Sequence, residues 1–161
     1  MKKYLIYLFI IIWLVVIFIF SAMSSDESNT SSIDTIKNVT NFTLKITNKI
    51  NVTNIDITDS FLDNVAVKLN YPLRKIMHMS VYFILTLLAL FMFSKNGLIG
   101  LDGIVCAMIL CVIVAMWDEI HQIFTGRSGM YKDVFIDSIG GIIACLIYTL
   151  GINWKNKKSI N

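Results

Sequence analysis

Carboxylate, imidazole and amide side chains gather in one short stretch that follows an apolar run. Residues 117–124 include Asp118, Glu119, His121 and Gln122. On a continuing helix Asp118 lies about one turn from both His121 and Gln122, so these side chains are neighbours. Carboxylates and imidazoles in such a set can bind a divalent cation, transfer protons or hold an anionic head group. The stretch is therefore a candidate site.

Two more acids open the next apolar run. Asp133 and Asp137 are four residues apart, and the same helical face continues through Gly140, Ala144 and Tyr148. Small residues on such a face let another helix pack closely. Asp137 lies about one turn inside the apolar boundary, so it requires a partner. The candidate partners are Arg127, which we expect beside the acids in a glycine-containing turn, and Lys132, Arg74 and His78.

A stripe of polar side chains marks the start of an earlier apolar run. Arg74, His78, Tyr82 and Thr86 recur every four residues, whereas the other faces carry Ile, Leu, Met and Phe. Such a stripe faces protein or water rather than lipid. A lone histidine on an apolar helix is commonly a packing residue, and this reading of His78 stays open. The acids also have a purely structural reading, in which ion pairs lock the helix ends together without chemistry.

The elements that carry these residues are membrane-spanning helices. Hydrophobic residues make up 56% of the 161-residue chain and charged residues 16%, and the mean hydropathy is +0.70, values outside the range of soluble domains. Four runs have the roughly 20 apolar residues that a crossing requires. They cover residues 4–23, 76–94, 98–117 and 134–152. We predict an all-α bundle of four transmembrane helices, in a single domain embedded in the lipid bilayer.

Basic residues near the span ends predict the orientation. Most of them fall on one side of a four-span protein, which places both termini in the cytoplasm of a multi-pass cell-membrane protein. These residues are Lys2, Lys3, Lys95, Lys155, Lys157 and Lys158. The basic residues form no aromatic-studded patch, so no nucleic-acid partner is expected. Cys106, Cys111 and Cys145 lie within apolar spans and are read as packing residues.

The segment 24–75 between the first two spans is expected outside the membrane. Ile36, Val39, Phe42 and Ile46 recur at near-helical spacing, and Ser60 can cap a second short helix. Both helices are candidates for lying on the outer leaflet. The alternative is a segment of biased composition without regular structure.

These residues together resemble the signature of the VanZ-like membrane proteins. The resemblance rests on Asp118 to Phe124, then Gly126-Arg127-Ser128, then Asp133, Asp137 and the pair Gly140-Gly141. Upstream, Arg74-Lys75-Ile76-Met77-His78 with Tyr82, and Phe18 with Phe20-Ser21, resemble further elements of the family. The resemblance implies a four-helix membrane protein of the cell envelope, from a family whose founding member is associated with resistance to the lipoglycopeptide teicoplanin. It implies no known reaction.

Two functions follow as hypotheses. In the first, the polar residues bind or modify an envelope lipid or lipid-linked precursor; whether the protein is an enzyme, and which cofactor or metal it uses, are left open. Catalytic roles as base, metal ligand or proton shuttle would fall to Asp118, Glu119, His121, Asp137 and His78. Substrate contacts would fall to Arg127, as phosphate anchor, and to Gln122, Asp133, Tyr82 and Arg74. In the second, the protein is a non-catalytic scaffold. Transport is the least supported, because broken midplane helices and repeats are lacking.

Overall fold

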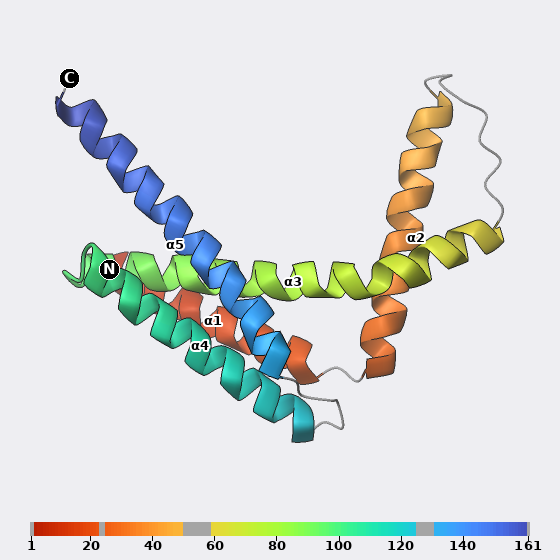
Figure 1. Ribbon diagram of the computed structural model, residues 1–161, viewed down its shortest axis with the longest axis horizontal. Coiled ribbons are helices and arrows are strands. Elements are labelled where there is room, and N and C mark those ends of the chain that lie inside the picture. Colours follow the sequence, from red (N-terminus) through yellow and green to blue (C-terminus); the bar gives the residue numbers. More distant parts are fainter. Residues whose placement is uncertain (1, 23–24, 50–58, 125–130, 161) are drawn as a thin grey trace. The chain divides into compact units, whose positions relative to one another are not determined.

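The described part of the chain is entirely helical apart from one short turn. The computed structural model describes residues 2–22, 25–49, 59–124 and 131–160. Five helices follow one another: α1 (Lys2–Ala22), α2 (Ser25–Lys49), α3 (Asp59–Lys95), α4 (Leu101–Phe124) and α5 (Tyr131–Ile160), shown in Figure 1. The predicted all-α class is confirmed.

The predicted membrane spans are also confirmed. Four helical segments of the described residues are long and apolar enough to cross a membrane: Tyr4–Ala22, Asp63–Lys95, Leu101–Phe124 and Tyr131–Ile152. Large apolar side chains stay exposed along these helices, among them Ile109, Ile113, Leu146 and Ile147. In a bilayer such surfaces contact lipid, while the helical backbone satisfies its own hydrogen bonds. The chain is a multi-pass membrane protein.

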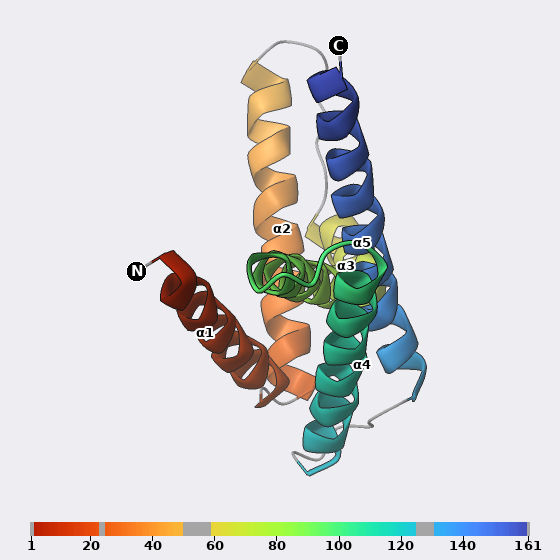
Figure 2. The same ribbon diagram turned by 90° about the vertical axis from the view of Figure 1, so that its left-hand side faces the viewer.

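The structure divides the chain into two units, which we describe separately. The bundle unit comprises Met1–Met23 and Met77–Asn161, and the α2 unit comprises Ser24–Ile76. In the bundle unit α4 packs against both α1 and α5, and the two views show α4 beside α5 (Figures 1 and 2). The indole Nε1 of Trp13 donates a hydrogen bond to the carbonyl of Val81 at 3.0 Å, which ties α1 to α3.

Small side chains allow the bundle helices to approach one another. Every fourth residue of the buried face of α4 is small: Gly103, Ala107, Cys111 and Ala115. On α5, a Cβ atom added to Gly140 would collide with the backbone carbonyl of Met79 on α3. At Gly141 it would lie 2.9 Å from the sulfur of Cys111. Close packing along the predicted small-residue face of α5 is therefore confirmed.

The turn between α3 and α4 ends later than the hydropathy pattern predicts. The amide of Leu98 donates to the carbonyl of Phe93 at 3.0 Å, and that of Gly97 to Ser94 at 3.2 Å. These are the two hydrogen bonds of a Schellman helix end. Gly97 and Gly100 have φ angles of 91° and 73°, a region that glycine enters without steric cost. The third span consequently starts at Leu101 rather than at residue 98.

The α2 unit confirms one predicted helix and corrects the other. Ile36, Val39, Phe42 and Ile46 all lie on α2, as their spacing predicts. The separate short helix predicted from Ser60 is wrong, because Asp59–Lys95 forms one helix that runs through Pro72 into the second span. An interior proline removes one backbone donor and crowds the preceding turn, yet the helix is continuous from Asp59 to Lys95. The predicted position on the outer leaflet stays a prediction.

Candidate functional site

Helix α3 contributes the predicted polar stripe to the bundle. Tyr82 and Thr86 are buried, and His78 is partly exposed. The Thr86 hydroxyl donates to the Tyr82 carbonyl at 2.9 Å, which satisfies it within its own helix. Tyr82 is 1% exposed, and within the described residues its hydroxyl makes no hydrogen bond of regular geometry. Tyr82 and Thr86 therefore face protein, one of the two predicted environments of the stripe, whereas its first residue, Arg74, belongs to the α2 unit.

Helix α4 contributes an acid and an amide that are hydrogen-bonded to each other. Asp118, Glu119 and Gln122 are buried, with only 5% of Asp118 exposed. They continue the buried face that the small residues occupy nearer the start of α4. The amide Nε2 of Gln122 donates to Oδ2 of Asp118 at 2.9 Å. The two side chains are neighbours, as their spacing predicts, and the hydrogen bond between them fixes the orientation of the Asp118 carboxylate.

Helix α5 contributes the most deeply buried acid. Asp137 is 1% exposed, and its Oδ1 lies 3.8 Å from Nδ1 of His78. Among the described residues of the bundle unit, His78 is a predicted partner that lies beside Asp137. Lys132 is exposed at the start of α5. Arg127 lies outside the described residues.

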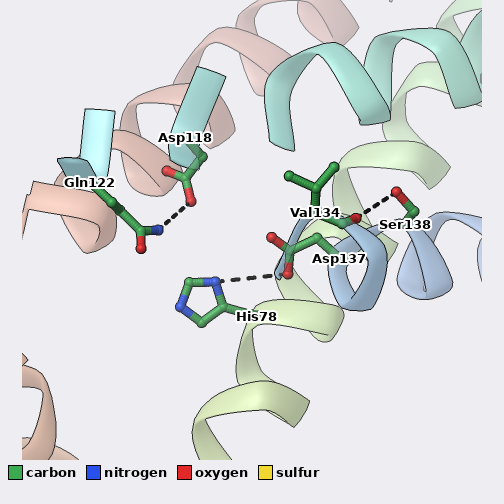
Figure 3. A network of polar contacts seen from close by, with 6 residues as sticks. All are labelled: His78, Asp118, Gln122, Val134, Asp137 and Ser138. Atoms are coloured by element: carbon green, nitrogen blue, oxygen red, sulfur yellow. Dashed lines mark hydrogen bonds and ion pairs between the residues drawn. The ribbon is translucent and has the colours of Figure 1, made fainter. Parts of the chain in front are cut away.

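Within the described residues of the bundle unit, the structure gathers part of the predicted set. Figure 3 shows the ring of His78 turned toward the carboxylate of Asp137, and the carboxylate of Asp118 turned toward the amide of Gln122 beside it. A ring nitrogen of His78 and one carboxylate oxygen from each aspartate lie within 4.8 Å of one another. Tyr82 lies close enough to interact electrostatically with both carboxylates. We call these five residues the polar cluster: His78, Tyr82, Asp118, Gln122 and Asp137. They come from three helices, α3, α4 and α5.

Other predicted site residues take different positions. The Nδ1 atom of His121 lies 3.3 Å from the hydroxyl of Ser21, and the His121 ring packs 4.4 Å from the ring of Phe18. His121 thus contacts α1. Arg74 belongs to the α2 unit, where its guanidinium donates to Oδ1 of Asn29 at 2.7 Å. Glu119 is buried and Asp133 is half-buried. Both are close in sequence to residues of the polar cluster.

Ser21 is a contact residue that the site prediction omitted. It is 2% exposed and joins the end of α1 to the end of α4 through His121. A serine at the end of an apolar run carries no helical periodicity that would single it out. Its place in the element Phe18-x-Phe20-Ser21, which resembles the family pattern, was the one signal available.

The polar cluster combines several chemical capacities. Two buried carboxylates and an imidazole can share protons or bind a cation. The Tyr82 hydroxyl can donate to a further oxygen. Because charged groups within a membrane are expensive, their gathering at one place in the bundle marks a functional site or a structural lock.

Taken together, the spans and the buried ionisable residues define a helical multi-pass membrane protein with a polar site between three of its spans. The comparison with known families agrees, because the model of the VanZ/LLP1 family matches residues 5–152. The chain belongs to the VanZ/LLP1 family, which confirms the resemblance seen in its motifs. No curated protein and no solved structure matches the chain.

Proposed function

We propose that this VanZ/LLP1 protein acts at the cell envelope, where the polar cluster binds or modifies the head group of an envelope lipid or lipid-linked precursor. The observation that carries the proposal is the burial of Asp118 and Asp137 beside His78, on three different spans. Ionisable groups destabilise a membrane bundle unless they are paired. Their gathering at one place therefore favours a role in binding or catalysis.

The position of the cluster supports a lipid ligand. Asp118 and Gln122 lie near the end of α4, and Asp137 lies near the start of α5. The cluster therefore sits toward one end of these spans, the level at which lipid head groups meet the protein. Arg127, in the connection between α4 and α5, is proposed as an anchor for a phosphate.

Reduced susceptibility to lipoglycopeptides is the phenotype that we propose to measure. Cells that express the intact protein are compared with cells that express Asp118→Asn or Asp137→Asn, and the amount of protein in the membrane is quantified in parallel. We expect the intact protein to lower teicoplanin susceptibility and both variants to abolish that effect at unchanged abundance. No effect of the intact protein would remove the drug phenotype from this chain.

A scaffold without catalysis is the second candidate. It is favoured by the contacts already present, since Gln122 bonds Asp118 and His78 neighbours Asp137. A structural lock predicts that both Asp→Asn variants lower the amount of folded protein as strongly as they lower function. Abundance measured in the same cells separates this outcome from the first.

A further inference from the structure

One histidine and two aspartates of the polar cluster point their ligand atoms at the same place. A ring nitrogen of His78 and one carboxylate oxygen each from Asp118 and Asp137 all lie within 4.8 Å of one another, and Figure 3 shows the three side chains converging from separate helices. We propose that His78, Asp118 and Asp137 together bind one divalent transition-metal ion. This inference rests on the proposed function, because the ion would link the acid-rich cluster to an anionic head group.

The separations fit ligands of one ion better than direct partners. Oxygen and nitrogen ligands lie about 2.0–2.2 Å from a zinc-sized ion, so two of them are about 3–3.5 Å apart. Nδ1 of His78 and Oδ1 of Asp137 are 3.8 Å apart, which is too long for a hydrogen bond. The widest separation of 4.8 Å exceeds the ligand spacing by about 1 Å. Binding one ion would therefore draw the three ligand atoms closer together by about 1 Å.

The charges of the cluster also favour a divalent ion. Asp118 is 5% and Asp137 1% exposed, so water screens their mutual repulsion weakly. A bound ion of charge two would lower this repulsion, because both carboxylates would coordinate it. The neutral imidazole of His78 adds a nitrogen ligand without adding positive charge.

Tyr82 and Gln122 supply two further features of a built metal site. Gln122 donates to Oδ2 of Asp118 at 2.9 Å and so orients the carboxylate, as outer partners of metal ligands do. The Tyr82 hydroxyl is buried, lies near both carboxylates and makes no regular hydrogen bond among the described residues. It is placed to donate to a water or phosphate oxygen that completes the coordination of the ion.

The donor set indicates which ions fit. Calcium takes six to eight oxygen ligands and magnesium keeps most of its water, whereas imidazole with carboxylates suits manganese, iron, cobalt and zinc. Three protein ligands leave open positions on such an ion. A phosphate oxygen bound there would be held by the ion, which explains how an anionic head group can approach two carboxylates.

The test uses the full-length protein in lipid nanodiscs, stripped with a chelator and titrated with Co²⁺ alone. We expect one ion per chain and an absorption band of bound Co²⁺, with affinity at least about tenfold lower in His78→Gln and in Asp137→Asn. The matched control is Asp102→Asn, the same change of an exposed acid on α4, which should bind as the parent does. Unchanged affinity in both cluster variants, or no saturable binding by the parent below about 1 mM, would overturn the proposal.

Folding and function are controlled separately. Monodispersity and thermal unfolding are compared for every variant, and if Asp137→Asn does not fold, His78→Gln decides, because this side chain is partly exposed. No lipid ligand or drug enters the titration. Stoichiometric Co²⁺ binding without any effect on teicoplanin susceptibility would uphold the metal site and overturn the proposed drug phenotype. A drug effect that depends on Asp118, found without Co²⁺ binding, would uphold the proposed drug phenotype and overturn the metal site.

Discussion

Each unit of the molecule contains an acid that lies beside a basic side chain. The contact in the α2 unit is shorter but exposed, whereas the contact in the bundle unit is longer and its acid is buried. In the α2 unit, Lys37 Nζ and Asp63 Oδ1 are 2.6 Å apart, but their side chains are 38% and 59% exposed. In the bundle unit, His78 Nδ1 and Asp137 Oδ1 are 3.8 Å apart, with exposures of 29% and 1%. Water screens the short pair and scarcely reaches the acid of the long one. We therefore expect burial, rather than the distance between the two atoms, to decide which contact contributes more to the free energy of unfolding.

Loss of the histidine should have the largest effect. In His78→Ala the buried Asp137 loses its contact with the imidazole, so we expect unfolding to become easier by up to about 3 kcal/mol, the low end for a broken buried pair. Thermal unfolding in nanodiscs with excess chelator measures the change free of any metal contribution. A loss below about 1 kcal/mol would equal that of an exposed ion pair. It would contradict the expectation that the buried contact contributes more to stability.

Tight packing around the buried pair is tested one turn further along α5. In Gly140→Ala the new methyl group meets the carbonyl of Met79, and we expect a loss of about 1–3 kcal/mol from the forced separation of α3 and α5. Gly151→Ala is the matched control on the same helix, because nothing lies within 4 Å of that position. It should be neutral or stabilise the helix by up to about 1 kcal/mol. Equal effects of the two changes would contradict the packing described here.

The hydrogen bond from Gln122 to Asp118 is a second buried contact whose contribution to stability can be measured. Gln122→Leu removes the donor to Asp118, and leaving a buried acceptor without it should destabilise by about 1–3 kcal/mol. Combining the change with Asp118→Leu isolates the contact as a double-mutant cycle. We expect the double variant to lose less than the sum of the single losses. Strict additivity would show that the two side chains act independently.

The exposed pair should give the smallest effect. Lys37→Ala is expected to cost at most about 1 kcal/mol, because both partners remain hydrated when separated. The loss should shrink further at 1 M salt, where the screening length falls to about 3 Å. Unfolding at low and high salt measures it. A loss as large as that of His78→Ala would mean that distance outweighs burial.

Much of the fold followed from hydropathy, and the exceptions have identifiable causes. Apolar runs located all the spans, but the start of α4 was misplaced by three residues because Leu98 looks apolar while it belongs to the helix-ending turn. The helix expected from Ser60 is part of α3, because the single interior proline does not end that helix.

The site was predicted in part. Asp118, Gln122, Asp137, His78 and Tyr82 were all named from their spacing, and they meet in the structure. His121 was grouped with them because it neighbours Asp118 on the helix, yet it contacts Ser21. Helical spacing assigns a residue to a face, and His121 lies on the side of α4 that faces α1. The side of the membrane on which the termini lie stays a prediction.

By itself, the sequence determined that this chain forms spanning helices and which of their faces are polar. It does so because a bilayer admits only segments that satisfy their own backbone, and because side chains follow the helical period. The tertiary structure alone decided which polar faces meet. Asp137 lies beside His78, and both lie near Asp118, because small residues bring α3, α4 and α5 together at that level. Helix packing depends on side chains from distant segments at once, and no local pattern specifies it.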